Sequence, residues 1–214
     1  AGIAYVTDKV NILKRKGKIS NLEEKIDINQ EGELGIAHTR WATHGEASDT
    51  NSHPHRMGEV TIVHNGIIEN YMELKKLLQK EGYEFQTETD TEVACAVLDY
   101  LKKKRIWSNL EIIKEFSSYV KGSYALGIIF DDELDVLYAT RQDSPLIIGI
   151  GEEENLIASD IAVKSGNIYL GFADRFTGTL IITGEISDVM SAMNEIIEYF
   201  RDSLEYVVCK VTKR

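Results

Sequence analysis

Polar side chains that could bind a small ligand gather in one short stretch of the sequence. The five histidines all lie between positions 38 and 64, and the motif HTRWATHG occupies 38–45. Arg40 in this motif could hold a ligand carboxylate through two parallel hydrogen bonds, although a surface ion pair would suit it equally well. Trp41 beside it could cover a small polar ligand or simply pack half-buried. This stretch is therefore the first candidate site region.

The pair Asn65-Gly66 follows an apolar run and precedes a predicted helix. A side-chain amide followed by a backbone N–H at such a place can form an oxyanion hole, which stabilises the negative charge of a tetrahedral intermediate. Asn-Gly is also a common turn signal, so the pair alone leaves both interpretations open.

The segment TDTE at 89–92 combines a helix start with a possible ligand contact. Thr89 and Glu92 match a capping box, which places Asp90 in the first helical turn. The Asp90 carboxylate could also face a ligand ammonium, and the two roles are compatible. A carboxylate binder, an ammonium binder and an oxyanion hole together suit an amino-acid substrate that is attacked at its side-chain carbonyl.

The sequence offers no convincing nucleophile for that attack. Cys95 lies in the apolar helical run ACAVL and is predicted to be a core residue. Cys209 in the strand-like YVVCKV is a poor candidate for the same reason. Neither Ser48 nor Ser52 has a nucleophile-elbow pattern around it.

The clustered histidines allow a second interpretation, a metallohydrolase. His53-Pro54-His55 together with Asp90 resembles the spacing of metal ligands. This hypothesis gives Arg40 and Asn65-Gly66 no role, and we therefore rank it below the amino-acid site.

The elements that must position these residues follow from hydrophobic periodicity and turn signals. Strands precede two or three helices, further strands follow, and a last helix ends the chain, without βαβ alternation; this order favours an α+β fold with antiparallel sheets. A hairpin is predicted around Asp8 and a loop at 41–58. Further strands are predicted at 33–40, 60–66, 123–130, 134–141, 146–151 and 155–160. Helices are predicted at Ser20 to Ile26, at 67–82, from the TDTE segment at 89–92 to Arg105, at Asn109 to Tyr119 and at Ser187 to Phe200.

Composition excludes several classes of partner. The 214 residues suit a single domain, and 43% hydrophobic and 28% charged residues are typical of a globular protein. The net charge of −11 argues against nucleic acid, and no apolar run approaches the ~18 residues of a membrane span. Two cysteines and the absence of a signal-peptide pattern lead us to expect a cytoplasmic protein with no membrane partner.

Longer motifs resemble a known family. HTRWATHG, HPH, VHNGIIENY, GYEF and TDTE reproduce, in order, motifs of class II glutamine amidotransferase domains. Among these, the chain most resembles the glutaminase domain of glucosamine-6-phosphate synthases (glutamine-fructose-6-phosphate aminotransferases). SYAL, DSPLIIG and ASD extend the likeness over residues 1–164.

The resemblance implies an N-terminal-nucleophile hydrolase fold, a four-layer αββα sandwich. It implies hydrolysis of L-glutamine to L-glutamate and ammonia, without cofactor or metal, for glucosamine-6-phosphate synthesis from fructose-6-phosphate. It also implies the sugar-isomerase domains of the full-length enzyme as partners, and a homodimer in that full-length form. The implied site consists of Arg40 for the α-carboxylate, Asp90 for the α-ammonium, Asn65 and Gly66 for the oxyanion, and Trp41, Thr43 and His44 for shaping and closing the pocket.

The chain departs from the family at both ends. The family nucleophile is a Cys at the mature N-terminus, whereas the first residue here is Ala1, and AGIA better matches a later family segment. We therefore expect about thirty residues, a strand and a helix with their loops, to be missing upstream and this chain to be inactive. From about Lys164 onward the tail no longer follows the family pattern. A non-catalytic glutamine-binding or regulatory module is the remaining alternative.

Overall fold

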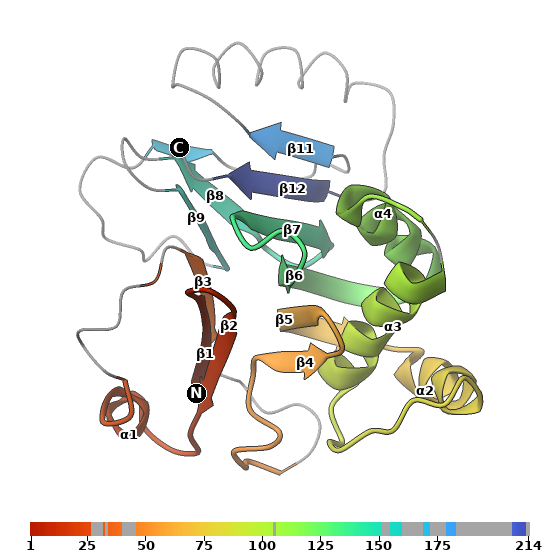
Figure 1. Ribbon diagram of the computed structural model, residues 1–214, viewed down its shortest axis with the longest axis horizontal. Helices are drawn as coiled ribbons and strands as arrows, with labels where there is room; N and C mark the ends of the chain where they lie inside the picture. The colour runs from red at the N-terminus through yellow and green to blue at the C-terminus, as the bar shows by residue number, and fades with distance from the viewer. Residues whose placement is uncertain are drawn as a thin grey trace.

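A computed structural model describes residues 1–26, 32, 34–39, 46–104, 106–150, 155–159, 169–171, 179–182 and 207–212 of the chain. The arrangement of the elements is shown in Figure 1. The helices are α1 (Ile19–Glu23), α2 (Tyr71–Lys80), α3 (Asp90–Lys104) and α4 (Asn109–Tyr119). The strands are β1 (Gly2–Val6), β2 (Val10–Lys14), β3 (Leu34–His38), β4 (His55–Met57), β5 (Val60–Ile68), β6 (Gly122–Phe130), β7 (Val136–Gln142), β8 (Ile147–Ile150), β9 (Asn155–Ala158), β10 (Tyr169–Gly171), β11 (Thr179–Ile182) and β12 (Val207–Thr212).

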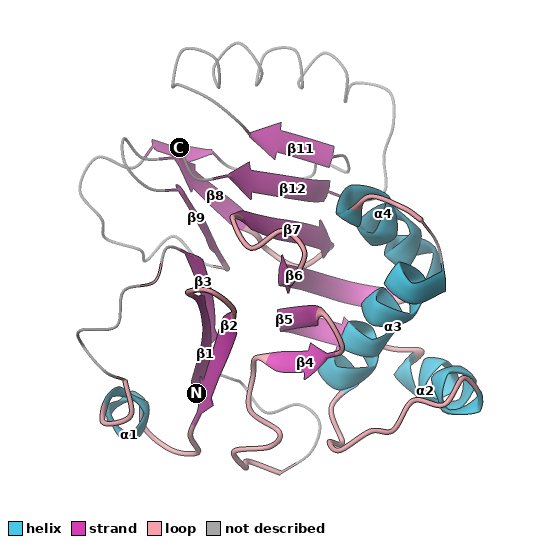
Figure 2. Cartoon of the chain, in the orientation of Figure 1, coloured by secondary structure: helices cyan, strands magenta, loops and turns pink. Residues whose placement is uncertain are grey.

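The strands form three sheets (Figure 2). The largest has the order β11-β12-β7-β6-β5-β4 and is antiparallel except for the β11–β12 pair. Two smaller antiparallel sheets have the orders β2-β1-β3 and β10-β8-β9. Each small sheet has two edge strands, β2 and β3 in the first and β10 and β9 in the second, and each of these has one side without a described partner strand.

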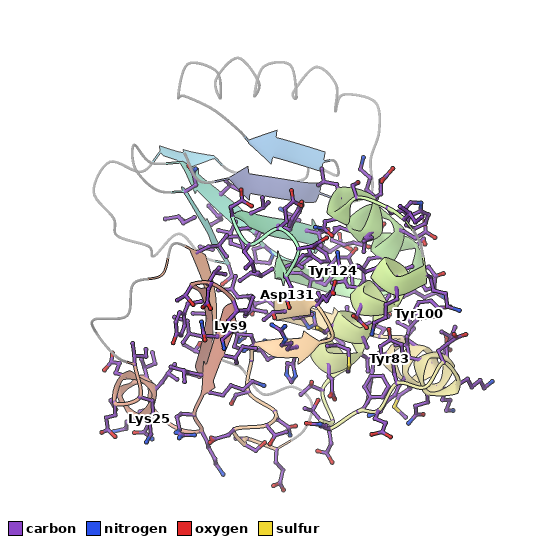
Figure 3. The ribbon with its side chains drawn as sticks, in the orientation of Figure 1. Lys9, Lys25, Tyr83, Tyr100, Tyr124 and Asp131 are labelled. Carbon is purple, nitrogen blue, oxygen red and sulfur yellow. The ribbon has the colours of Figure 1, made fainter. Side chains whose placement is uncertain are left out.

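One face of the large sheet is covered by helices. Helix α3 packs on β5 and contacts α2 on one side and α4 on the other. The core between them includes Ile62, Leu98 and Ile112, all fully buried. Tyr124, labelled in Figure 3, is also fully buried there and meets the Phe116 ring edge to face.

The opposite face of the large sheet carries a second, smaller core. Ala4 and Ile36 from the β2-β1-β3 sheet pack with Ile129 and Leu137 of the large sheet. Helix, sheet and sheet thus form three successive layers, and α1 is the only helix described outside the α2–α4 layer. The α+β class with antiparallel sheets is confirmed. No described helix is long and apolar enough to cross a bilayer.

Most predicted elements are found within a few residues of their expected bounds, and two differ. The strand predicted to stop at Asn65-Gly66 continues to Ile68, because β6 pairs with β5 as far as Gly122. Ile67, predicted to start the next helix, is therefore a strand residue. Within the predicted loop 41–58, residues 55–57 form β4, and 41–45 lie outside the described residues. The predicted helix at 187–200 lies outside them as well.

Candidate active site

Gly66 marks an irregular point in β5. Its φ is +117°, a conformation that L side chains rarely adopt, yet it still pairs with Tyr124 of β6. A Cβ at this position would lie 2.0 Å from the Ser123 carbonyl oxygen. The turn interpretation of Asn65-Gly66 is therefore wrong: the glycine allows β5 and β6 to stay paired through a distorted residue.

Asn65 lies where the three sheets approach one another. It helps to line a cavity of about 220 Å³ whose walls come mainly from β3, β5, β6 and β9. Most of the lining residues are aliphatic or glycine, and His38, Asn65 and Asn155 are among the polar ones. The Asn65 Oδ1 lies 2.8 Å from His38 Nε2 on β3. The amide predicted to hold an oxyanion thus faces a cavity that could admit a small group.

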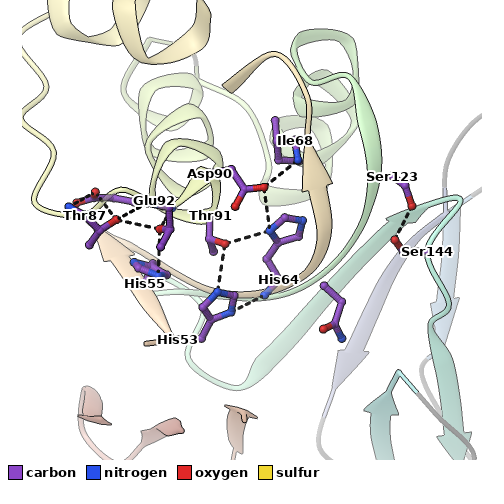
Figure 4. Close-up of polar contacts among 12 residues, drawn as sticks. His53, His55, His64, Ile68, Thr87, Asp90, Thr91, Glu92, Ser123 and Ser144 are labelled. Atoms are coloured by element: carbon purple, nitrogen blue, oxygen red, sulfur yellow. Dashed lines mark hydrogen bonds and ion pairs between the residues drawn. The ribbon is translucent and has the colours of Figure 1, made fainter. Parts of the chain in front are cut away.

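Asp90 is buried at the start of α3, with 3% of its surface exposed. Its Oδ2 accepts a hydrogen bond from the Ile68 backbone N–H at 2.9 Å and lies 4.0 Å from His64 Nδ1 (Figure 4). The carboxylate therefore ties the N-terminus of α3 to β5, two residues beyond Gly66. Asp90 thus has a structural role, linking α3 to β5, that was not predicted from the sequence.

The predicted capping box at 89–92 forms only in part. The Glu92 backbone N–H donates to Thr89 Oγ1 at 3.2 Å, which caps the helix as expected. The Glu92 carboxylate instead accepts hydrogen bonds from the backbone N–H groups of Gln86 and Thr87. The reciprocal half of the box is absent because the Thr89 backbone N–H donates to Thr87 Oγ1 instead.

Three of the five histidines form a buried network with the start of α3 (Figure 4). Thr91 Oγ1 lies 3.0 Å from His64 Nδ1 and 3.2 Å from His53 Nε2. His53 Nδ1 accepts the His64 backbone N–H at 3.3 Å, and His55 Nε2 lies 3.3 Å from Thr89 Oγ1. The His53 ring also stacks on the ring of His38, with centroids 4.3 Å apart.

These contacts oppose the metallohydrolase hypothesis. Both ring nitrogens of His53, and one ring nitrogen each of His55 and His64, are engaged by threonine hydroxyls or a backbone N–H. In the part of the chain that the structure describes, no three His, Cys, Asp or Glu side chains are arranged to hold a metal ion. The network is a polar core that joins β4 and β5 to α3.

Cys95 is confirmed as a core residue. It is fully buried in α3, and its thiol lies within hydrogen-bonding distance of the Val60 and His55 carbonyl oxygens. Burial raises the pKa of this thiol well above its ordinary value. Such a thiol is a poor nucleophile.

The structure brings together only part of the predicted site. Asn65 and Gly66 are adjacent on β5, and Asp90 is bonded to the same strand. Two residues that sequence reasoning did not single out, His38 and Thr91, contact this region. The remaining predicted residues, Arg40, Trp41, Thr43 and His44, lie outside the described residues.

Comparisons with known proteins agree with this geometry. A family model described as a glutamine amidotransferase domain matches residues 38–163, more than half of the chain. Glutamine–fructose-6-phosphate aminotransferases [isomerizing] are similar in sequence: the Clostridium tetani protein is 53% identical over 167 residues, 75% of this chain. Those of Clostridium acetobutylicum and Methanosarcina mazei are 50% and 46% identical, each over 96% of the chain. The chain spans only 27% to 35% of the length of these three relatives.

Solved structures give the same picture for the fold. Glutamine phosphoribosylpyrophosphate amidotransferase from B. subtilis superposes with a TM-score of 0.62 at 26% identity. The similarity covers 74% of this chain and 35% of that one. A second family model, described as a BMC domain, matches residues 147–213 and overlaps the first over 147–163.

Proposed function

Because the chain belongs to the glutamine amidotransferase domain family, we propose that it is the glutaminase part of a glucosamine-6-phosphate synthase and takes L-glutamine as its substrate. The observation that carries the proposal is the Asn65-Gly66 pair, held at the wall of a cavity where three sheets meet. The sequence similarity to glutamine–fructose-6-phosphate aminotransferases supports the same assignment.

The proposed reaction is acyl transfer through a thioester. A cysteine thiolate adds to the side-chain carbonyl carbon of glutamine, and the carbonyl oxygen takes the negative charge. The Asn65 Nδ2–H and the Gly66 N–H stabilise this oxyanion. The α-amine of the same cysteine takes the thiol proton and passes it to the departing nitrogen, so the tetrahedral intermediate collapses with loss of ammonia. Water then hydrolyses the γ-glutamyl thioester to glutamate and restores the thiol.

Recognition of the amino-acid end of glutamine is assigned to other side chains. We propose that Arg40 binds the α-carboxylate through paired hydrogen bonds and that Asp90 binds the α-ammonium. Trp41, Thr43 and His44 then shape and close the pocket. The Ile68 N–H engages Oδ2 of Asp90, so the ammonium is assigned to Oδ1.

The nucleophile is proposed to come from a segment outside these 214 residues that begins with Cys. Cys95 is not a suitable nucleophile, because it is buried and burial raises the pKa of its thiol. We propose that the cysteine-bearing segment lies between β3 and β9. Both are edge strands among the described residues, and the cavity of about 220 Å³ lies between them. An extended segment placed there could pair with both edges and bring its first residue close to Asn65.

The finer assignments rest on the relatives. We propose that the ammonia serves glucosamine-6-phosphate synthesis from fructose-6-phosphate on sugar-isomerase domains of a longer, homodimeric, cytoplasmic protein. We also propose that residues 1–214 form a single domain and that its resemblance to the family lies mainly in residues 1–164. The match of a BMC domain model to residues 147–213 supports the expectation that the C-terminal tail does not follow the sequence pattern of the amidotransferase family.

Glutamate release from glutamine tests the proposal directly. The chain is joined to its natural preceding coding segment, and glutamate and ammonia are measured with glutamine as substrate. We expect one of each per glutamine, no activity when the first Cys is replaced by Ala, and a loss on the order of 10²- to 10³-fold in kcat for Asn65→Ala. Tight glutamine binding without turnover in the joined protein would instead favour a non-catalytic module.

A further inference from the structure

The hydrogen bond between His38 and Asn65 joins two different sheets. His38 ends β3 in the β2-β1-β3 sheet, whereas Asn65 lies on β5 of the large sheet. Their atoms Nε2 and Oδ1 are 2.8 Å apart across 27 residues of sequence. We propose that His38 is a positioning residue: its Nε2–H holds the Asn65 amide in the one orientation that can stabilise an oxyanion. This inference rests on the proposed function.

The two ends of the Asn65 amide have opposite hydrogen-bonding character. The oxygen accepts hydrogen bonds and the NH₂ group donates them. When His38 Nε2–H donates to Oδ1, the NH₂ group of Asn65 is directed away from His38 and is available to a developing oxyanion. If Nε2 carried no proton, the amide would turn its NH₂ group toward His38 and present its oxygen to the oxyanion. The tautomer of His38 therefore decides whether Asn65 stabilises or repels the intermediate.

The surroundings of His38 hold its ring in place. The ring stacks on His53 with an interplanar angle of 26°, and the backbone of His38 pairs with Gly2 of β1. His53 in turn is buried, with 6% of its surface exposed, and is fixed by contacts to the His64 backbone and to Thr91. His38 therefore packs, through His53, against the polar network that joins β5 to α3.

That network has a defined proton arrangement. A backbone N–H can only donate, so His53 Nδ1, which accepts from the His64 N–H, carries no proton. In neutral His53 the proton is on Nε2, which donates to Thr91 Oγ1. The Thr91 hydroxyl then donates to His64 Nδ1. The His64 backbone N–H thereby sets the tautomer of His53, which stacks on the His38 ring, and through Thr91 the tautomer of His64.

Two substitutions separate the hydrogen-bond donor of His38 from the aromatic ring that stacks on His53. His38→Phe keeps an aromatic ring on His53 but removes the N–H, whereas His38→Gln loses the ring and retains an N–H donor of similar reach. In the joined, cysteine-bearing protein we expect kcat for glutamine to fall on the order of 10²-fold in the Phe variant, with KM changed less than about threefold, because the interaction acts on the oxyanion. We expect the Gln variant to recover at least about tenfold of that loss. Equal losses in the two variants, or a loss confined to KM, would overturn the proposal.

A second measurement does not depend on catalysis. In the ¹⁵N-labelled 214-residue chain, long-range ¹H–¹⁵N correlations report which imidazole nitrogen carries the proton. We expect His38, identified by the signals that vanish in His38→Gln, to be protonated at Nε2. An unprotonated Nε2 would overturn the positioning role even if the joined protein hydrolyses glutamine. A protonated Nε2 in a joined protein without turnover would leave the geometry intact and refute the proposed function alone.

Discussion

At the residue scale, Gly66 illustrates how one backbone conformation can hold a site together. Its φ is positive, and a Cβ added to it would approach the Ser123 carbonyl oxygen to 2.0 Å, which excludes a side chain without movement of β5 or β6. We expect Gly66→Ala to lower the free energy of unfolding by more than about 2 kcal/mol, from strain and steric clash together. Urea denaturation followed by circular dichroism measures this difference.

Gly82 provides a matched control for Gly66. It also has a positive φ, +90°, but a Cβ there would meet no atom within 4 Å. We expect Gly82→Ala to cost only the backbone strain, about 1 kcal/mol. Equal effects of the two substitutions would show that the contact with Ser123 is unimportant.

Asp90 has a structural contact and a proposed ligand contact that one substitution can separate. Asp90→Asn retains an oxygen that can accept the Ile68 N–H but removes the negative charge. We expect KM for glutamine to rise on the order of 10- to 100-fold in the joined protein, because a charge-assisted hydrogen bond to the substrate ammonium is lost. The melting temperature should change little.

Asp90→Ala serves as the comparison for that variant. It removes both the charge and the acceptor, so we expect it to raise KM and also to destabilise the fold by about 1–3 kcal/mol, since the Ile68 N–H is left buried and unsatisfied. An unchanged KM in Asp90→Asn would remove the ammonium role and leave Asp90 as a link between α3 and β5.

At the scale of elements, two segments show what a sequence pattern can and cannot predict. Both 89–92 and 108–111 read Ser/Thr-x-x-Glu, and each spans the start of a helix. In the second, Ser108 and Glu111 form both reciprocal hydrogen bonds. In the first, Glu92 bonds to the turn before the helix instead. The helix starts were predictable from local sequence, but the competing donors come from a turn whose path the pattern does not specify.

The loop between α2 and α3 is anchored by a tyrosine. Tyr83 donates to the buried Asp99 carboxylate at 2.7 Å and lies beside Tyr100 of α3 (Figure 3). Burial, followed by the bond to Asp99, raises the pKa of Tyr83 above its ordinary value. The folded protein therefore keeps the phenolic proton at pH values where the unfolded chain loses it.

This shift predicts a pH-dependent effect of Tyr83→Phe. Because the folded pKa is raised, the stabilisation is fully present below the unfolded pKa of about 10 and is lost as pH rises through the folded value. We expect the variant to be about 1 kcal/mol less stable from pH 7 to 9 and the difference to shrink above pH 10. Melting curves of both proteins across that range provide the measurement. A difference that stays constant to pH 11 would contradict this origin.

At the scale of the whole molecule, the site depends on contacts between segments far apart in the sequence. The sequence patterns predicted antiparallel strand pairing and all four described helices, because periodicity is a local property. The pairing of His38 with Asn65, and the cavity between β3 and β9, required three sheets to be assembled. Local patterns contain no information about how sheets pack on each other, which is why His38 was recognised as part of a motif but not as a partner of Asn65.

The same arrangement makes a prediction about β3 and β9. If a cysteine-bearing segment lies between them, the backbone N–H groups on their facing edges become hydrogen-bonded and their exchange with solvent slows. Within residues 34–38 and 155–158, we expect the amides that point away from β1 and β8 to exchange on the order of 10²-fold more slowly in the joined protein than in the 214-residue chain, while α4 changes little. Hydrogen exchange read by NMR or mass spectrometry measures both regions together. Equal exchange at β3 and β9 in the two proteins would place the segment elsewhere and leave Asn65 without the nucleophile that the proposed reaction requires.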